Sequence, residues 1–398
     1  MMENFQEKRI LILGNVNSIH LKGFIERVII PLGFKVGAFC NANSSEGIEE
    51  QKKYLIKNQI KVFDNKRNIR ENFCRILKDK LHFGKVASYI KGLMEKVYVL
   101  IVKSFNTYDI IHINYVDVWA LKLATSLKKK NTKLIATFWG SDLMRVSDEE
   151  LKARWIYLKR FDIVSTDSID LENRFKAVYG ENNKFIDAMP RICFGSEIAE
   201  NIDKFLLCDS RQILEKVIPV EKLVISIGYN AGKAQQHIRV LEALSKLSED
   251  IKKDIIIILQ MTYQKPLDDY VDEVFKYSKN AGFETYQFTE YLSSSEVARI
   301  RVATDIFINA QTTDAFCSTI KEYMYAKTIL VNARWLEYKE MDEWGLKSEV
   351  FDDFDEIPAL IKNIKRNNQD TINNRNIIRD KFSWDACRVE WEKIYRAL

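Results

Sequence analysis

Residues 305–332 read DIFINAQTTDAFCSTIKEYMYAKTILVN and contain the most informative pattern in the chain. The apolar run at 305–310 predicts a buried strand, and 318–326 predict a helix that begins after the polar loop 311–317. A second apolar run at 328–332 predicts another strand. A strand, a helix and a strand in this order predict a βαβ unit with two parallel strands.

The alternation of short apolar runs with amphipathic stretches continues through most of the chain. A first series of expected strands covers 10–13, 35–39, 109–113, 133–138 and 162–165, and a second covers 223–228, 254–261, 285–288, 305–310 and 328–332. Helical spacing of apolar residues is seen between them, at 21–29, 118–127 and 149–158. Repeated strand–helix units predict an α/β fold with parallel sheets that helices cover on both faces.

The two series of strands predict two consecutive doubly wound, Rossmann-like domains. Residues 1–195 hold the first series and 223–380 the second, with the interdomain connection expected at 196–222. In open parallel sheets, ligands bind at the carboxyl ends of the strands, where the strand order reverses. The candidate site residues are therefore expected in the loops that follow the strands.

The composition is that of a soluble globular protein, with 46% hydrophobic and 29% charged residues among 398. Fourteen glycines and five prolines exclude collagen-like and low-complexity architectures. The net charge of +5 is uneven, because 65–103 hold ten basic and three acidic residues and the rest of the chain sums to −2. This basic segment, interleaved with apolar residues, suits an anionic membrane surface, with a solvated helix face as the alternative. No nucleic-acid-binding module accompanies it, so nucleic acid is not an expected partner.

The six cysteines are scattered and contain no C-x-x-C pair. A disulfide framework or a structural zinc site needs closer spacing, so free thiols in a reducing compartment are expected. The apolar run 97–102 is far shorter than the roughly 20 residues that span a bilayer. These features predict a cytoplasmic protein whose membrane contact, where present, is peripheral.

The segment from Gly228 to Ala234 follows an expected strand and precedes an expected helix, as a phosphate-binding loop does. It is one residue short of the G-x-x-x-x-G-K-[ST] pattern, and Ala234 stands where a magnesium-binding hydroxyl is needed. An ATPase loop is therefore disfavoured. Glycine amides, a helix N-terminus and Lys233 are consistent with a more general anion site. A plain turn with a solvated lysine is the alternative.

Two other patterns point away from common cofactor and metal sites. Gly14 stands alone after the first expected strand, without the G-x-G-x-x-G spacing, which disfavours a nicotinamide dehydrogenase. Asp353 and Asp355 have the D-x-D spacing of some metal-diphosphate sites. They precede a helical stretch, where acidic residues cap the helix and suit its dipole, so capping is the favoured interpretation.

Asp314 and Glu322 are the candidate ligand-binding carboxylates of the second domain. Asp314, next to Thr313, lies in the strand-to-helix loop, and Glu322 follows eight residues later on the helix. Carboxylates accept hydrogen bonds from vicinal sugar hydroxyls, and the helix N-terminus between them suits a phosphate. Taken alone, an N-cap aspartate and a solvated glutamate are the simpler interpretation.

The segment 314–331 resembles the E-x7-E segment of glycosyltransferase family 4, whose members have the two-domain GT-B fold. The resemblance continues in order along most of the chain. It includes Asn17-Ser-Ile-His20-Leu-Lys, Tyr108-Asp-Ile-Ile-His112, Thr137-Phe-Trp-Gly140-Ser-Asp142, Ser165-Thr-Asp-Ser168, Ile227-Gly228 with Lys233, and Phe382-Ser-Trp384. Separately, Ile227–Gly232 with His237-Ile238, and Gln260–Tyr263, look similar to the transferases that add 4-acetamido-fucose to a lipid-linked sugar. The family's usual first Glu is Asp314 here, and Trp139 stands where a His is common.

On the donor side, the resemblance implies that Gly228 and Lys233 bind the diphosphate of a nucleotide sugar. His237, one helical turn further, is a second candidate for the phosphates, with a helix-surface histidine as the alternative. The remaining expected donor contacts are Thr313, Asp314, Ser318, Thr319 and Glu322. Glu322 would hold the ribose, and Asp314 would hold the sugar hydroxyls and is also an expected catalytic residue.

On the acceptor side, the resemblance implies a site at the strand ends of the first domain. The expected acceptor-binding residues are Asn15, Ser18, His20, Gly140 and Ser141. Asp142 or His20 would be the general base if the enzyme inverts the anomeric centre. His112 ends a buried strand and is expected to be structural. The C-terminal helix at 381–398 is expected to cross back to the first domain.

Together with the residues, the resemblance implies a metal-independent GT-B glycosyltransferase that moves a sugar from a nucleotide-diphosphate donor, UDP- or dTDP-linked, to a lipid-linked or growing surface polysaccharide. No cofactor is expected. The enzyme would lie in the cytoplasm, attached peripherally to the inner face of the cell membrane through 65–103. A GT-B sugar-nucleotide epimerase and a non-catalytic GT-B partner subunit remain as alternatives.

Overall fold

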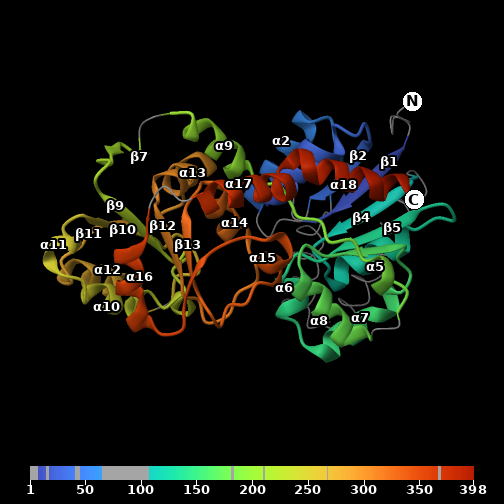
Figure 1. The fold of residues 1–398 in the computed structure, drawn as a ribbon. Coiled ribbons are helices and arrows are strands. Elements are labelled where there is room, and N and C mark those ends of the chain that lie inside the picture. Colours follow the sequence, from blue (N-terminus) through green and yellow to red (C-terminus); the bar gives the residue numbers. More distant parts are fainter. Residues whose placement is uncertain are drawn as a thin grey trace, which may run out of the picture. The chain divides into compact units, whose positions relative to one another are not determined.

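The computed structural model describes residues 8–14, 18–40, 45–64, 107–180, 183–208, 211–266, 268–365 and 369–398 (Figure 1). The chain divides into two compact units. The first comprises Met1–Phe194 with Cys387–Leu398, and the second comprises Gly195–Ala386. The basic segment 65–103 and Asn15 lie outside the described residues, so the expectations placed on them stay predictions.

The first unit is built on a six-stranded sheet in which every described strand pair is parallel. Its strands are β1 (Arg9–Leu13), β2 (Lys35–Cys40), β3 (Lys61–Asp64), β4 (Ile110–Asn114), β5 (Lys133–Thr137) and β6 (Ile163–Ser165). They stand in the order β3-β2-β1-β4-β5-β6. All five residues of β4 are buried, as expected for a strand covered on both faces.

Helices cover both faces of this first sheet (Figure 1). They are α1 (Ile19–Phe24), which a π-helical turn continues over Ile25–Ile29, then α2 (Ser45–Lys57), α5 (Val118–Leu127), α6 (Ser141–Met144), α7 (Asp148–Leu158), α8 (Ile169–Tyr179), a 3-10 turn at Ile186–Ala188, and α18 (Trp384–Arg396). On one face, α5, α7 and α8 pack their apolar residues against Ile111 and Ile113 of β4. On the opposite face, Trp391 and Tyr395 of α18 are fully buried against His112.

The second unit repeats the same plan. Its strands are β9 (Leu223–Ile227), β10 (Ile255–Gln260), β11 (Glu284–Phe288), β12 (Ile306–Asn309), β13 (Ile329–Ala333) and β14 (Glu349–Phe351). They stand in the order β11-β10-β9-β12-β13-β14 and all pair in parallel. The expected strand–helix–strand unit at 305–332 forms as β12, α14 (Ser318–Tyr325) and β13.

The helices of the second unit also form two layers. The remaining elements are α9 (Glu197–Leu206), α10 (His237–Ser245), α11 (Glu249–Lys252), α12 (Tyr270–Asn280), α13 (Ser294–Ala303), α15 (Lys339–Trp344), α16 (Ile357–Asn363), α17 (Gln369–Phe382), and 3-10 turns at Lys233–Gln235 and Phe354–Glu356. Helices α10, α12 and α16 contact one another on one side, and α9, α13, α14 and α17 do so on the other. Residues 196–222, assigned above to a connection, lie in this unit and form α9 and a hairpin of β7 (Gln212–Ile213) and β8 (Lys216–Val217).

Each sheet has one point at which the strand order reverses. In the first unit it lies between β1 and β4, and in the second between β9 and β12. Connections from the carboxyl ends of these neighbouring strands diverge to opposite sides, which opens a crevice where ligands of such folds bind. The Gly14 and Gly228 turns follow β1 and β9, so both lie at these switch points.

None of the helices among the described residues is long and apolar enough to cross a membrane.

Candidate functional site

The turn after β9 requires glycine for two reasons. Gly228 has a φ of +61°, a region in which a side chain is strained. A Cβ added there would lie 2.8 Å from both Gln235 Oε1 and His237 Nε2. The backbone of Gly228 therefore lies directly against these two side chains, at the switch point of the second sheet.

A buried hydrogen-bond network connects this turn to the loop after β12. Gln235, almost fully buried, accepts from the Tyr229 amide at 3.3 Å, and its amide donates to Gln311. Gln311 donates to the Tyr229 hydroxyl at 3.3 Å, and that hydroxyl donates to Asp314 Oδ2 at 3.1 Å. The network therefore fixes the position of the Asp314 carboxylate, and neither Gln235 nor Gln311 was singled out from the sequence.

Asp314 lies in the loop between β12 and α14, and its role as a sugar-binding carboxylate stays a prediction. Its Oδ1 accepts from the amide of Ala315, and Cys317 Sγ donates to Oδ2 at 3.6 Å. Burial raises the pKa of Asp314 to about 6, although the hydrogen bonds from Tyr229 and Ala315 oppose the shift. Burial and the neighbouring Asp314 charge also raise the pKa of Cys317, to about 12, so this thiol is protonated near neutral pH.

His237 is the first residue of α10 and is fully buried, so it is not a helix-surface histidine. Its Nδ1 lies 3.2 Å from the Tyr270 hydroxyl, and its Nε2 has no hydrogen-bond partner. Burial lowers the pKa of His237 to about 4, so the imidazole is neutral at physiological pH. The Nε2 atom is buried at the N-terminus of α10, directly against Gly228.

The other expected donor residues surround the same strand ends. Lys233 begins the 3-10 turn after Gly232, is more than half exposed, and forms an ion pair with Asp268. Ser318 and Thr319 are the first two residues of α14 and half-buried, and Thr313 accepts a hydrogen bond from Gln311 through its carbonyl. The structure therefore brings these residues to the carboxyl edge of the second sheet, with Lys233 at its exposed rim.

Glu322 lies on α14 as expected, but its carboxylate is buried among protein groups. It is 3% exposed, its Oε1 accepts from Ser196 at 2.9 Å, and its Oε2 lies 3.5 Å from Nε of the buried Arg301. Burial raises the pKa of Glu322, whereas the charge of Arg301 lowers it. Arg301 also donates to Gln260 at 2.8 Å and lies over the Tyr323 ring. Both carboxylate oxygens are thus engaged within the protein, and the expected ribose contact stays a prediction.

The expected acceptor residues that the structure describes lie at the carboxyl edge of the first sheet. Ser18 and His20 are half-buried at the start of α1, and the His20 ring packs edge-to-face on Trp139 at 5.8 Å. Gly140, with a φ of +130°, precedes Ser141, whose hydroxyl lies 3.3 Å from the hydroxyl of Tyr115. His20 therefore lies half-buried beside the Trp139 ring.

Asp142 does not have the surroundings of a general base. It is 1% exposed, and its oxygens accept from the amides of Val116 at 2.7 Å, Trp139 at 2.9 Å and Gly140 at 3.0 Å. Burial raises its pKa to about 6, against the opposing effect of these amides. The side chain joins the loops after β4 and β5, contacts that do not favour its expected catalytic role, which stays a prediction.

Asn114 is a candidate that the sequence analysis missed. It ends β4 beside Gly14, is 1% exposed, and neither its Oδ1 nor its Nδ2 has a hydrogen-bond partner. The indole Nε1 of Trp139, at the end of the adjacent β5, is also buried without a partner. Buried polar groups are almost always paired, so two unpaired ones at a switch point mark a place where a hydroxyl-rich ligand would supply the missing bonds.

Two earlier interpretations are confirmed. His112 is fully buried between the Tyr395 hydroxyl, 2.8 Å from Nδ1, and the Thr137 hydroxyl, 2.7 Å from Nε2, and burial lowers its pKa to about 3. It is structural. Asp353 caps the 3-10 turn at Phe354–Glu356 by accepting from the Asp355 amide at 2.9 Å. Within the described ranges, no group of three or more His, Cys, Asp or Glu side chains is arranged to hold a metal ion.

No family model matches the sequence, and no curated protein does. Solved structures match its fold over nearly the whole chain. Anabaena Alr3699/HepE in complex with UDP is 17% identical, with a TM-score of 0.65, and the match covers 98% of this chain and 100% of that one. A glycosyltransferase from Rickettsia africae is 15% identical with a TM-score of 0.63, covering 98% of each chain. Sucrose-phosphate synthase from Thermosynechococcus elongatus is 12% identical with a TM-score of 0.59, covering 98% and 99%.

These identities establish a shared architecture. Both the topology of the two sheets and the near-complete coverage of the matched chains agree with two Rossmann-like domains in one polypeptide. The chain therefore has the GT-B fold, as expected from the sequence.

Proposed function

We propose that the protein is a glycosyltransferase that moves a sugar from a nucleotide-diphosphate donor to a lipid-linked or growing surface polysaccharide. The observation that carries the proposal is the pair of switch-point sites, each lined by polar groups suited to one of the two substrates. The presence of UDP in the HepE complex supports a nucleotide sugar as the donor. We favour UDP- or dTDP-linked donors.

The second unit would bind the donor. A departing diphosphate needs hydrogen-bond donors and positive potential near its oxygens. The Gly228 turn, His237 Nε2 and the N-termini of α10 and α14 supply them at the same strand ends. His237 donates through Nε2 when its Nδ1 accepts from the Tyr270 hydroxyl. Lys233 would exchange Asp268 for a phosphate oxygen.

Asp314 would orient the donor sugar. Its Oδ2 is fixed by Tyr229, and the remaining lone pairs are suited to vicinal hydroxyls. Holding the anomeric carbon in place in this way lowers the entropic part of the barrier to transfer. The reaction would need no metal, because side chains and helix N-termini offset the charge of the diphosphate; turnover in EDTA tests this point.

The first unit would bind the acceptor, with His20 as the candidate base for its hydroxyl. Asn114 and Trp139 would hold neighbouring hydroxyls through the atoms that lack partners in the free protein. We further propose that the enzyme works in the cytoplasm at the inner face of the cell membrane, where a lipid-linked acceptor is available.

The test is acceptor-dependent release of the nucleotide diphosphate. A thermal-shift panel of UDP, dTDP and GDP sugars identifies the donor, and turnover is then measured with and without a lipid-linked or oligosaccharide acceptor. Release that requires the acceptor supports the transferase. An epimerised sugar nucleotide formed without an acceptor would show an epimerase instead. The absence of turnover with every donor would identify a non-catalytic subunit.

A further inference from the structure

The amino ends of the strands in the first sheet form a strongly basic edge, opposite the candidate site. β1 is preceded by Lys8 and begins at Arg9, and β2, β3 and β5 begin at Lys35, Lys61 and Lys133. Arg9 pairs with Lys35 in the sheet register, and the Lys35 amide donates to the Lys8 carbonyl at 3.0 Å. Five cationic side chains therefore line one edge of the sheet.

Two helix-to-strand turns add five more cations to the same edge. Lys128, Lys129 and Lys130 follow α5, and Lys159 and Arg160 follow α7. Lys128 Nζ donates to the Arg160 carbonyl at 3.1 Å, which places the two turns side by side. Lys129 Nζ donates to the Thr107 hydroxyl, just before β4, at 3.1 Å. We call these ten side chains the basic edge.

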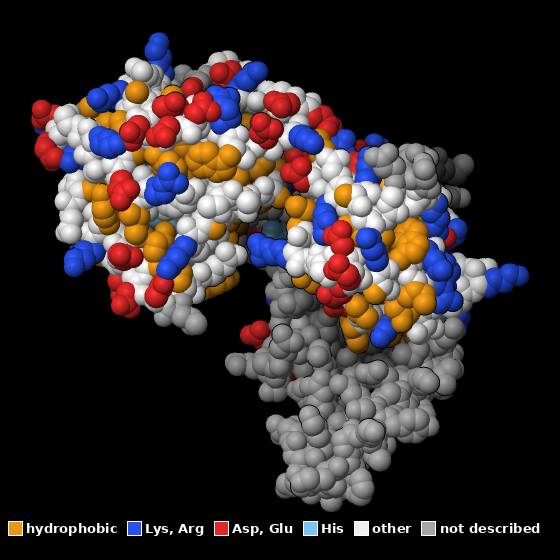
Figure 2. All heavy atoms as spheres, turned by 90° about the horizontal axis from the view of Figure 1, so that it is seen from below, with side chains coloured by type: hydrophobic (Ala, Val, Ile, Leu, Met, Phe, Trp, Pro, Cys, Tyr) orange, Lys and Arg blue, Asp and Glu red, His pale blue; other side chains and the backbone are white. Residues whose placement is uncertain are grey.

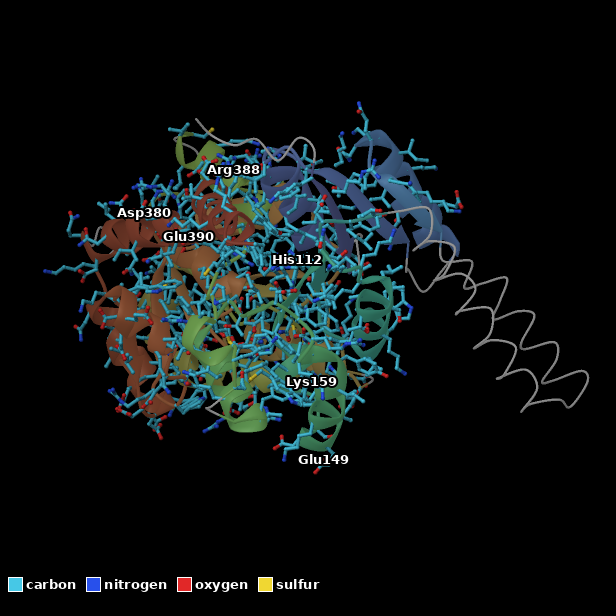
Figure 3. All side chains as sticks on the ribbon, turned by 90° about the vertical axis from the view of Figure 1, so that its right-hand side faces the viewer. His112, Glu149, Lys159, Asp380, Arg388 and Glu390 are labelled. Atoms are coloured by element: carbon cyan, nitrogen blue, oxygen red, sulfur yellow. The ribbon has the colours of Figure 1, made fainter. Side chains whose placement is uncertain are left out.

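Among the described residues of these strand starts and turns, the carboxylates are those of Asp109 and Asp162. Asp109 accepts from the Arg9 amide at 2.7 Å. Asp162 is bonded by Lys128 at 3.2 Å and faces Lys133 at 3.7 Å. The acidic first turn of α7 lies at its other end, and Figure 3 shows Glu149 and Lys159 at opposite ends of this helix. In Figure 2, Lys and Arg side chains gather at the right-hand end of the view.

A pocket of about 460 Å³ opens into the basic edge beside the first three strands. Arg9, Lys35 and Lys61 contribute to its lining. Phe34 and Ile60, both buried, are among its apolar residues. The lining thus combines three cations with apolar and uncharged polar side chains, among them Ile30, Asn58 and Gln59. A phosphate that carries a hydrocarbon chain can contact both the cations and the apolar residues, whereas a nucleic-acid backbone would use the cations alone.

We propose that the basic edge docks on an anionic phospholipid bilayer and that its pocket takes the phosphate end of one lipid. The inference deepens the membrane association of the proposed function, but it does not depend on sugar transfer. Because the two edges of a parallel sheet lie about one strand length apart, roughly 17 Å for five residues, docking here leaves the switch-point site of this unit uncovered. The basic edge is thus a second candidate membrane-binding surface, in addition to the basic segment 65–103.

The test uses the full chain in sedimentation with phosphatidylcholine vesicles, with or without phosphatidylglycerol. The variant Lys35→Gln, Lys61→Gln, Lys130→Gln removes three exposed cations from the basic edge and leaves 65–103 intact. The matched control is Lys246→Gln, Lys253→Gln, Lys265→Gln on the second unit, whose side chains are 56%, 66% and 43% exposed.

We expect binding that requires phosphatidylglycerol and that falls about 100-fold in the edge variant, since each cation near an anionic surface contributes about fivefold. The control should bind like the wild type.

Equal binding by the edge variant and the wild type would overturn the proposal, and so would an equal loss in both variants, which would indicate net charge alone. Displacement by glycerol phosphate at constant ionic strength would indicate a site for free phosphate instead. Binding to duplex DNA without binding to vesicles would also overturn it. Turnover with a soluble acceptor analogue is measured separately, so that a failure of membrane binding is distinguished from a failure of the proposed sugar transfer.

Discussion

The two units share one topology and differ in charge and in how their switch points are filled. Both sheets have the same relative strand order, with the first strand next to the fourth. The first unit carries a net charge of +12 and the second −7, which together make the chain's +5. The basic segment accounts for +7 of the first value, so the rest of that unit is basic as well. A near-neutral total thus conceals two halves of opposite charge.

At the switch points, four side chains of the second unit bond to one another, although His237 Nε2 lacks a partner there, whereas both polar atoms of Asn114 in the first unit lack one. Gln235, Gln311, Tyr229 and Asp314 bond to one another around Gly228. By contrast, Asn114 of the first unit is buried without partners. We infer that side chains at the second site contribute to stability as well as to binding, while the unpaired groups at the first contribute to binding alone. The predictions below test this difference, from the largest expected effect to the smallest.

The largest effect is expected from breaking the buried ion pair behind the second site. Arg301→Leu leaves the Glu322 carboxylate buried with Ser196 as its remaining partner, which should lower the unfolding free energy by about 3–5 kcal/mol. Denaturant unfolding measures the change. The double variant Arg301→Leu, Glu322→Leu should recover most of the loss, since no buried charge remains. A single variant as stable as the wild type would show that the pair does not support α14.

Each unit also contains one buried aspartate whose pKa is raised to about 6, Asp142 in the first and Asp314 in the second. In an unfolded chain the value is near 3.9, so the folded protein binds the proton more tightly. The contribution of each aspartate to stability is therefore greatest below about pH 4 and is lost as the pH rises from about 4 to about 6, by up to about 1.4 kcal/mol per pH unit. Between about pH 4 and pH 6, the loss of unfolding free energy approaches about 3 kcal/mol per aspartate.

Urea unfolding between pH 4 and pH 7 measures this dependence. Asp142→Asn and Asp314→Asn should each remove about half of the extra slope, and the double variant should remove it. The exposed Asp250→Asn, on the surface of the second unit, serves as the control and should leave the slope unchanged. If one aspartate variant alone removed the whole slope, the two units would differ in this respect as well.

Most of the architecture was predictable because parallel strands covered on both faces are continuous apolar runs. Thus the strand at 255–260, which is buried throughout, is predicted directly from its run of isoleucines. The edge strands β3 and β14 were missed because they are short and include Lys61, Asp64 and Glu349. The helix expected at 21–29 forms as α1 and a π-helical turn, a change of hydrogen bonding that apolar spacing does not reveal.

The site was less predictable, because a side chain's role depends on which partners the fold supplies. Asp142 and Glu322 are plausible catalytic or ligand-binding acids from their spacing alone. The spacing does not reveal that the amides of Trp139, Gly140 and the distant Val116 bond Asp142. Nor does it reveal that Ser196 and Arg301, 126 and 21 residues away in sequence, bond Glu322. Asn114 carried no signal, since an asparagine after an apolar strand usually begins a turn.

A smaller loss of stability is expected from a substitution at Gly228. Here the cost of backbone strain can be separated from the cost of close contacts with the new side chain. Gly345 also has a positive φ, +73°, but no atom lies within 4 Å of a Cβ built there. Gly345→Ala should therefore lower stability by about 1 kcal/mol from backbone strain alone. Gly228→Ala adds contacts at 2.8 Å with His237 and Gln235, and should cost about 1–3 kcal/mol more. It should also weaken nucleotide binding, as measured by calorimetry, whereas Gly345→Ala should not. Equal losses of stability would show that the Gly228 turn tolerates a side chain.

The smallest effect on stability is expected at Asn114, and it tests the first unit most directly. Asn114→Leu has a similar volume and removes an amide that makes no hydrogen bond, so stability should be unchanged or rise by about 1 kcal/mol. If the amide binds acceptor hydroxyls, acceptor kcat/KM should fall by at least about tenfold, the equivalent of roughly 1.4 kcal/mol for one hydrogen bond, while donor affinity stays constant. A stable variant with normal acceptor kinetics would remove Asn114 from the acceptor site. A strongly destabilised one would show that the first switch point, like the second, supports the fold.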